Sequence, residues 1–112
     1  MTCIHTLFDT TAERFEGSAV VSNNVWMQVT AVYDGTNPSA NMRVIVYLNG
    51  VVDSMQTDTV TSLPKSPAKV SIGAMPSSLA VQNFKGVLDE VVVWTRALSQ
   101  AEVTQWYEAT KP

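Results

Sequence analysis

The sequence predicts an all-β domain of antiparallel strands with one short helix at its C-terminal end. Short runs of β-branched and aromatic residues recur along the chain, and turn-forming residues separate them at short spacing. A single helix-start signal stands near the C-terminus. A chain of 112 residues can build one hydrophobic core, so residues 1–112 are expected to form a single domain.

Four strands are expected in the first half of the chain. The two that alternate most clearly between apolar and polar residues lie nearest the middle. In the last of them, the alternation directs Val44 and Val46 into the core and Arg43 and Tyr47 outward. The four expected strands cover residues 2–8, 18–21, 26–33 and 42–48.

Asn49-Gly50 is the strongest hairpin signal in the chain. A type I′ turn needs positive φ at both central positions, and Asn and Gly adopt it most easily. Residues 51–57 should therefore return antiparallel to the strand before the turn. Two further strands are predicted at residues 70–73 and 84–94, the second being long and rich in valine.

A helix is expected to begin after Ser99. Ser99 and Glu102 have the spacing of a capping box, in which each side chain satisfies a backbone amide of the other. Leu98 and Val103 have the spacing of a hydrophobic staple. The helix should place one apolar stripe on the sheet, formed by Val103, Trp106 and Tyr107.

Charge and hydropathy exclude several classes of function. The formal net charge is -3 and the seven Lys and Arg residues are scattered, which argues against binding to nucleic acid. No apolar run approaches the roughly 18 residues that span a bilayer, so membrane insertion is not expected. The first residues lack the pattern of a signal peptide. Cys3 is the sole cysteine, which rules out an internal disulfide and leaves the cellular compartment open.

An ordered set of residues resembles the laminin-G-like, or concanavalin A-like, lectin and glucanase domains. It runs from Trp26 through Tyr33-Asp34-Gly35 and the Val46–Gly50 turn region to the residues around Asp89, Trp94 and Ser99. The resemblance implies an antiparallel jelly-roll β-sandwich and an extracellular or cell-surface location. The chain resembles a truncated domain of this kind, because it lacks several N-terminal strands of the family.

The sequence contains no convincing catalytic or metal site. Asp89 and Glu90 are neighbours, and neighbours on a strand point to opposite faces, so they cannot act together on one sugar. Calcium needs several converging oxygen ligands, and Asp34 and Asp53 are isolated. His5 has no recognisable partner except Cys3, two residues away. We therefore expect no enzyme activity and no cofactor.

Outward-facing polar and aromatic residues form the predicted binding apparatus. Tyr rings stack on the apolar faces of sugars, while Gln and Arg side chains bond sugar hydroxyls. The predicted ligand-binding residues are Gln28, Arg43 and Tyr47. The expected function is a non-catalytic binding module for carbohydrate or a glycoprotein. The alternative is a structural or interaction module without a small ligand, which completes its sandwich by homodimerisation or with a partner chain.

Overall fold

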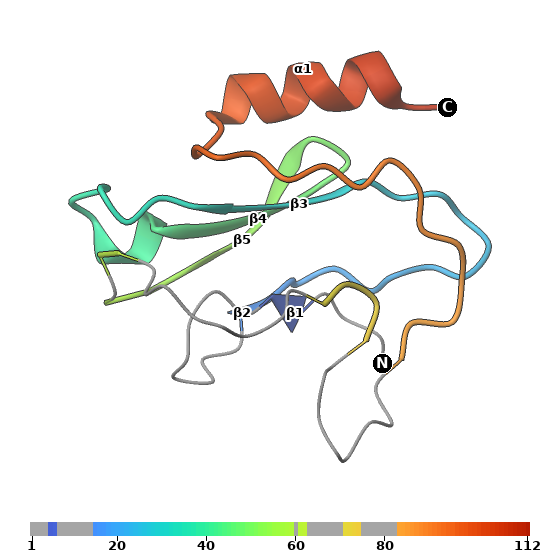
Figure 1. Ribbon diagram of the computed structural model, residues 1–112, viewed down its shortest axis with the longest axis horizontal. Coiled ribbons are helices and arrows are strands. Elements are labelled where there is room, and N and C mark those ends of the chain that lie inside the picture. The colour runs from blue at the N-terminus through green and yellow to red at the C-terminus, as the bar shows by residue number, and fades with distance from the viewer. Residues whose placement is uncertain (1–4, 7–14, 60, 63–70, 75–82) are drawn as a thin grey trace. The chain divides into compact units, whose positions relative to one another are not determined.

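The computed structural model describes residues 5–6, 15–59, 61–62, 71–74 and 83–112 (Figure 1). The chain divides into two compact units. The first unit combines residues 1–64 with residues 95–112, and the second unit covers residues 65–94. In the described part of the first unit most of the regular elements are strands, with a short 3-10 helix, η1 (Ala40–Met42), and one C-terminal α-helix, which the sequence predicts.

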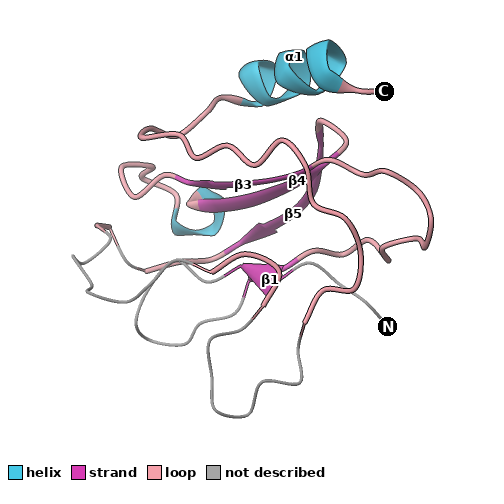
Figure 2. Ribbon diagram, turned by 45° about the vertical axis from the view of Figure 1, so that its right-hand side comes forward, coloured by secondary structure: helices cyan, strands magenta, loops and turns pink. Residues whose placement is uncertain are grey.

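A three-stranded antiparallel sheet is the centre of the first unit (Figure 2). Its order is β3-β4-β5, with β4 in the middle, and Ala31 of β3 lies opposite Val46 of β4. Two short strands, β1 (His5–Thr6) and β2 (Phe15–Glu16), form a separate antiparallel ladder. The three strands of the sheet are β3 (Val29–Tyr33), β4 (Val44–Leu48) and β5 (Val51–Gln56).

The predicted hairpin at Asn49-Gly50 is confirmed. It joins β4 to β5, and both turn residues have positive φ, 51° at Asn49 and 77° at Gly50. Asn49 also holds the chain that enters β3, because its side-chain oxygen accepts a hydrogen bond of 2.9 Å from the backbone N–H of Gln28. The turn therefore fixes both the β4–β5 register and the start of β3.

Strand β5 contains an irregularity opposite Val46 and Tyr47, where the register shifts. Ser54 pairs with Val46 and Val52 pairs with Tyr47, so Asp53 has no partner in the ladder. Such bulges redirect the side chain of the extra residue. The Asp53 carboxylate accepts hydrogen bonds from two successive backbone amides, those of residues 18 and 19, at 2.6 and 2.9 Å.

Helix α1 (Gln100–Thr110) begins with the predicted capping box. Ser99 Oγ accepts a hydrogen bond from the backbone N–H of Glu102 at 3.3 Å, and Glu102 Oε2 accepts one from the backbone N–H of Ser99 at 2.8 Å. The two residues of the predicted staple, Leu98 and Val103, are both buried. They share a hydrophobic cluster with Val32 and with Tyr47.

Glu102 makes the stability of the helix start depend on pH. The bidentate hydrogen bond from Arg96, followed by the bond from the Ser99 amide, lowers the pKa of Glu102 from 4.5 to about 2. A lowered pKa contributes stability that is fully present above pH 4.5 and is lost as the pH falls towards 2. We expect the melting temperature to drop in this window, and to drop less in Glu102→Gln, which retains the cap but has no charge to lose. Equal acid sensitivity of the two proteins would contradict this role of Glu102.

Both faces of the central strand are covered. Val44 and Val46 are fully buried on one face, and Tyr47 on the other face retains 2% of its exposure. The predicted outward direction of Tyr47 is therefore wrong. Alternation separates the two faces of a strand correctly, but it does not reveal that the cluster containing Leu98 and Val103 covers the second face.

Three predicted strands are not formed among the described residues. Residues 18–21, 71–73 and 84–94 have no strand pairing, while the short strand β2 lies at Phe15–Glu16 instead. The described part of the second unit contains one isolated bridge, between Ala74 and Asn83. Strand residues need a neighbouring strand to bond, and propensity alone does not supply one. The two-sheet sandwich stays a prediction.

Candidate functional site

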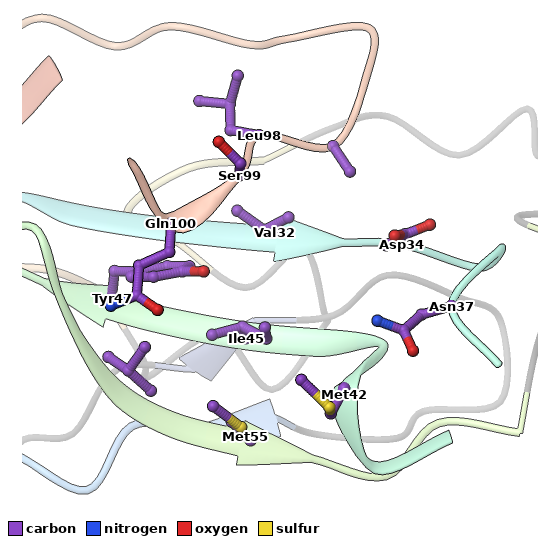
Figure 3. Close-up of a pocket in the computed structure, with 12 residues that line it drawn as sticks. Val32, Asp34, Asn37, Met42, Ile45, Tyr47, Met55, Leu98, Ser99 and Gln100 are labelled. Atoms are coloured by element: carbon purple, nitrogen blue, oxygen red, sulfur yellow. The ribbon is translucent and has the colours of Figure 1, made fainter. Parts of the chain in front are cut away.

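A groove of about 260 Å³ lies between the sheet and the start of helix α1 (Figure 3). Strands β3, β4 and β5 supply its apolar floor, and residues 97–100 supply one wall. Two methionines also line it and are exposed to solvent, Met42 at the end of η1 and Met55 on β5. The remaining floor side chains are Val32, Ile45, Tyr47 and Val52.

Polar groups from the loop between β3 and β4 stand at one end of the groove. Asp34 Oδ1 accepts hydrogen bonds from the backbone and the hydroxyl of Thr36, and Asn37 Oδ1 accepts one of 3.0 Å from the Ser39 amide. These bonds fix the loop and orient both side chains. Within the described part of the chain, the second carboxylate oxygen of Asp34 and the amide nitrogen of Asn37 make no hydrogen bond, so both can bind a ligand.

The start of helix α1 supplies a second set of polar groups. Gln100 is the first residue of the helix and lines the groove. Figure 3 shows its side chain extending towards the sheet near Tyr47. Among the described residues the Gln100 amide makes no hydrogen bond, so it retains two donors and an acceptor. The neighbouring Ser99 hydroxyl accepts the capping bond and keeps its own proton available.

Of the three predicted ligand-binding residues, Tyr47 alone lines the groove. Burial raises the pKa of its hydroxyl, which therefore stays protonated over a wider pH range. Its ring is too deeply buried to offer a stacking surface. Tyr47 thus contributes to the floor of the groove and to the core at the same time.

Arg43 contacts the backbone of the loop that carries Asn37. Its Nε donates to the Asn37 carbonyl at 3.0 Å, and its Nη1 donates to the Asp58 carbonyl at 2.9 Å. The guanidinium therefore ties the loop to the chain that leaves β5. In this position Arg43 holds the rim of the groove rather than facing into it.

Gln28 lies at the hairpin end of the sheet, away from the groove. Its amide nitrogen donates to the Thr110 hydroxyl at 2.9 Å, near the end of helix α1, and its buried amide oxygen has no hydrogen-bond partner among the described residues. Arg43 and Tyr47 are four residues apart along an extended chain, or roughly 13 Å. The structure thus does not gather Gln28, Arg43 and Tyr47 into one site, and their direct contact with ligand stays a prediction.

Sequence reasoning did not identify Asn37, Gln100 or Met55 as site residues. Asn37 lies between the expected strands at residues 26–33 and 42–48, and Gln100 follows the expected helix cap at Ser99. Neither pattern says that the loop and the helix start face one another across a sheet. Both segments are polar, as binding loops often are. This polarity identifies a site only when the fold brings the two segments together.

The described ranges of the chain contain neither a candidate metal centre nor a candidate membrane span. No group of three or more His, Cys, Asp or Glu residues there could hold a metal ion. No helix there is long and apolar enough to cross a bilayer. Asp89 accepts a hydrogen bond from the Glu90 amide at 2.8 Å, which is a contact between sequence neighbours. Cys3 lies outside the described residues.

Comparison with known proteins gives two similarities. The family model described as "Concanavalin A-like lectin/glucanases superfamily" matches residues 4–104. The crystal structure of an S-layer domain-containing protein from Clostridium thermocellum is similar, with a TM-score of 0.58 and 21% sequence identity. The similarity covers 85% of this chain and 45% of that chain, so this chain corresponds to less than half of the solved one. No functionally curated protein matches.

Proposed function

Because this chain belongs to the concanavalin A-like lectin/glucanase superfamily, we propose that it is a non-catalytic binding module that recognises carbohydrate or a glycoprotein. The jelly-roll sandwich and the extracellular or cell-surface location are part of the same proposal. The observation that carries it is the groove, in which polar groups with free hydrogen-bonding capacity surround an apolar floor.

The size and chemistry of the groove fit one sugar unit. Its volume of about 260 Å³ is slightly below the range of roughly 300–1,000 Å³ that holds drug-sized ligands. A sugar presents hydroxyls that both donate and accept hydrogen bonds, and it presents apolar C–H groups on its faces. The amides of Asn37 and Gln100 and the carboxylate of Asp34 match the hydroxyls, while the floor around Ile45 and Met55 matches the C–H groups.

Gln100→Ala should weaken binding of the best ligand from a panel of neutral oligosaccharides. Loss of one hydrogen bond of about 1 kcal/mol corresponds to roughly fivefold in Kd. Gln105→Ala is the matched control, because Gln105 is exposed on the same helix and does not line the groove. Isothermal titration calorimetry measures both variants. An equal effect of the two substitutions, or no binding to any member of the panel, would count against the proposal.

Asn37→Asp removes the side-chain donor of Asn37 and keeps the hydrogen bond that fixes the conformation of the loop. Aspartate keeps the oxygen that accepts the Ser39 amide, so the loop should retain its conformation. It removes the Nδ2 donor, and binding should weaken by about three- to tenfold. Asn23→Asp adds the same charge at an exposed turn outside the groove and should leave Kd unchanged. If both variants bind as the parent does, Asn37 does not contact the ligand.

A second candidate function is an interaction module that needs no small ligand. It is supported by large apolar side chains exposed on the described part of the second unit. This candidate predicts concentration-dependent association in analytical ultracentrifugation together with a blank glycan panel.

A further inference from the structure

The segment of residues 87–94, here called the valine segment, exposes an apolar surface. Val93 retains 80% of its exposure and Val87 retains 71%. Among the described residues, the backbone of residues 87–93 makes no hydrogen bond to another backbone group. Glu90 N donates instead to the neighbouring Asp89 side chain. The other large apolar side chains exposed in the segment are Leu88, Val91, Val92 and Trp94.

The composition of the valine segment conflicts with its conformation. Val, Leu and Trp dominate it, and it contains neither proline nor glycine, which is typical of a strand that pairs. Glu90 nevertheless has a φ of 50°. Among the described residues the other non-glycine residues with positive φ are Asn24 and Asn49, and asparagine tolerates the left-handed region better than glutamate does. An extended conformation would remove the backbone strain at Glu90 and would match the preference of valine for β-strands.

The two ends of the valine segment carry charges of opposite sign, so two antiparallel copies of the segment are complementary in charge. Acidic residues Asp89 and Glu90 stand at one end, four apolar residues follow, and Arg96 stands two residues after Trp94. Two copies aligned antiparallel place the acidic end of each beside the basic end of the other. A parallel alignment would place like charges side by side, which destabilises a strand pair.

We propose that residues 89–97 of two copies of this chain pair as antiparallel β-strands across a twofold axis, with Glu90 of each copy opposite Arg96 of the other. Pairing centred on Val93 gives this register and also sets Val92 opposite Trp94. The two-fold symmetry makes every favourable contact occur twice. Arg96 is exposed and keeps its ion pair with Glu102 in its own chain while it receives the second carboxylate.

The partner strand comes from a second copy of this chain, because residues 89–97 carry both the acidic and the basic residues that the pairing needs. A strand from an unrelated chain would have to supply the reversed pattern independently. The valine segment does not line the groove, and of the paired residues 89–97 only Ala97 does, so the pairing goes beyond the proposed sugar binding and does not depend on it. Pairing would also satisfy backbone groups of residues 89–93, which have no backbone partner within the described residues.

Analytical ultracentrifugation of the full chain over a concentration series tests the pairing. We expect a monomer–dimer equilibrium in the parent protein. Val92→Pro removes a backbone donor and blocks strand pairing, so it should raise the dimer Kd at least tenfold. Val92→Thr keeps a β-branched side chain and the backbone donor, so it should have a much smaller effect. A monomer at every concentration, or equal effects of proline and threonine, would overturn the proposal.

Charge reversal tests the orientation and register. Glu90→Arg should weaken the dimer by placing two positive charges together, and the double variant E90R/R96E should restore most of the affinity. Circular dichroism checks that helix α1 persists when Arg96 no longer pairs with Glu102. If the dimer is unaffected by Glu90→Arg, or if the double variant is no tighter than the single one, the antiparallel register is wrong.

Discussion

Tyr47→Ala is expected to lower the free energy of unfolding by about 3–5 kcal/mol, the range for removal of a large aromatic side chain from a core. Tyr47 retains 2% of its exposure and packs in one cluster with Val32, Leu98 and Val103. Its loss would leave a cavity between the sheet and the helix start. Urea unfolding followed by circular dichroism measures the change, and a variant as stable as the parent would show that the ring is not in the core.

Tyr47→Phe is the matched control, because it keeps the ring and removes only the hydroxyl. We expect it to change stability by about 1 kcal/mol or less. The two proteins should differ at alkaline pH. Because burial raises the pKa of Tyr47 above 10.0, its stabilising contribution is present below pH 10 and is lost as the pH rises through the raised pKa. Tyr47→Phe should lack this alkaline loss.

Gly50→Ala is expected to lower the free energy of unfolding by about 2–4 kcal/mol through backbone strain and crowding together. Gly50 has a φ of 77°, which L-residues other than glycine adopt with strain. A Cβ at this position would lie 3.0 Å from Cβ of Tyr107 on helix α1. Gly50 also accepts a hydrogen bond of 2.8 Å from the Thr104 hydroxyl, so the helix docks directly on the turn.

A double-mutant cycle separates the two contributions of Gly50. Tyr107→Gly removes the whole neighbouring side chain, including the Cβ that lies 3.0 Å away, so Gly50→Ala in that background should lose the crowding and retain the backbone strain. The apparent effect of Gly50→Ala should fall to about 1–2 kcal/mol. An unchanged effect would mean that Tyr107 does not crowd this position, and thermal unfolding by calorimetry distinguishes the two results.

Structural features that depend only on residues close together in the sequence were predicted correctly. The positive φ angles of Asn49 and Gly50 follow from the conformational freedom of these two residues. The capping box of Ser99 and Glu102 follows from donors and acceptors three residues apart. In both cases the groups that interact lie within a few residues, so no knowledge of the rest of the fold is needed.

Features that depend on distant partners could not be predicted in the same way. The alternation of strand β4 gave its two faces correctly, but the cluster with Leu98 and Val103 buries Tyr47 on the face expected to be outward. Arg43 was expected to face a ligand, and it instead holds two backbone carbonyls. Each outcome depends on which segments meet in space.

The sequence by itself determined the family, the β3–β4–β5 hairpin region and the capped helix, since each depends on local pattern and turn chemistry. The tertiary structure alone decided where the groove lies, because its lining joins a loop, a sheet face and a helix start that are up to 68 residues apart. It also decided that residues 84–94 form no strand within the part of the chain that the structure describes. A strand is completed by hydrogen bonds to a neighbour, and a propensity for β structure does not specify which neighbour that is.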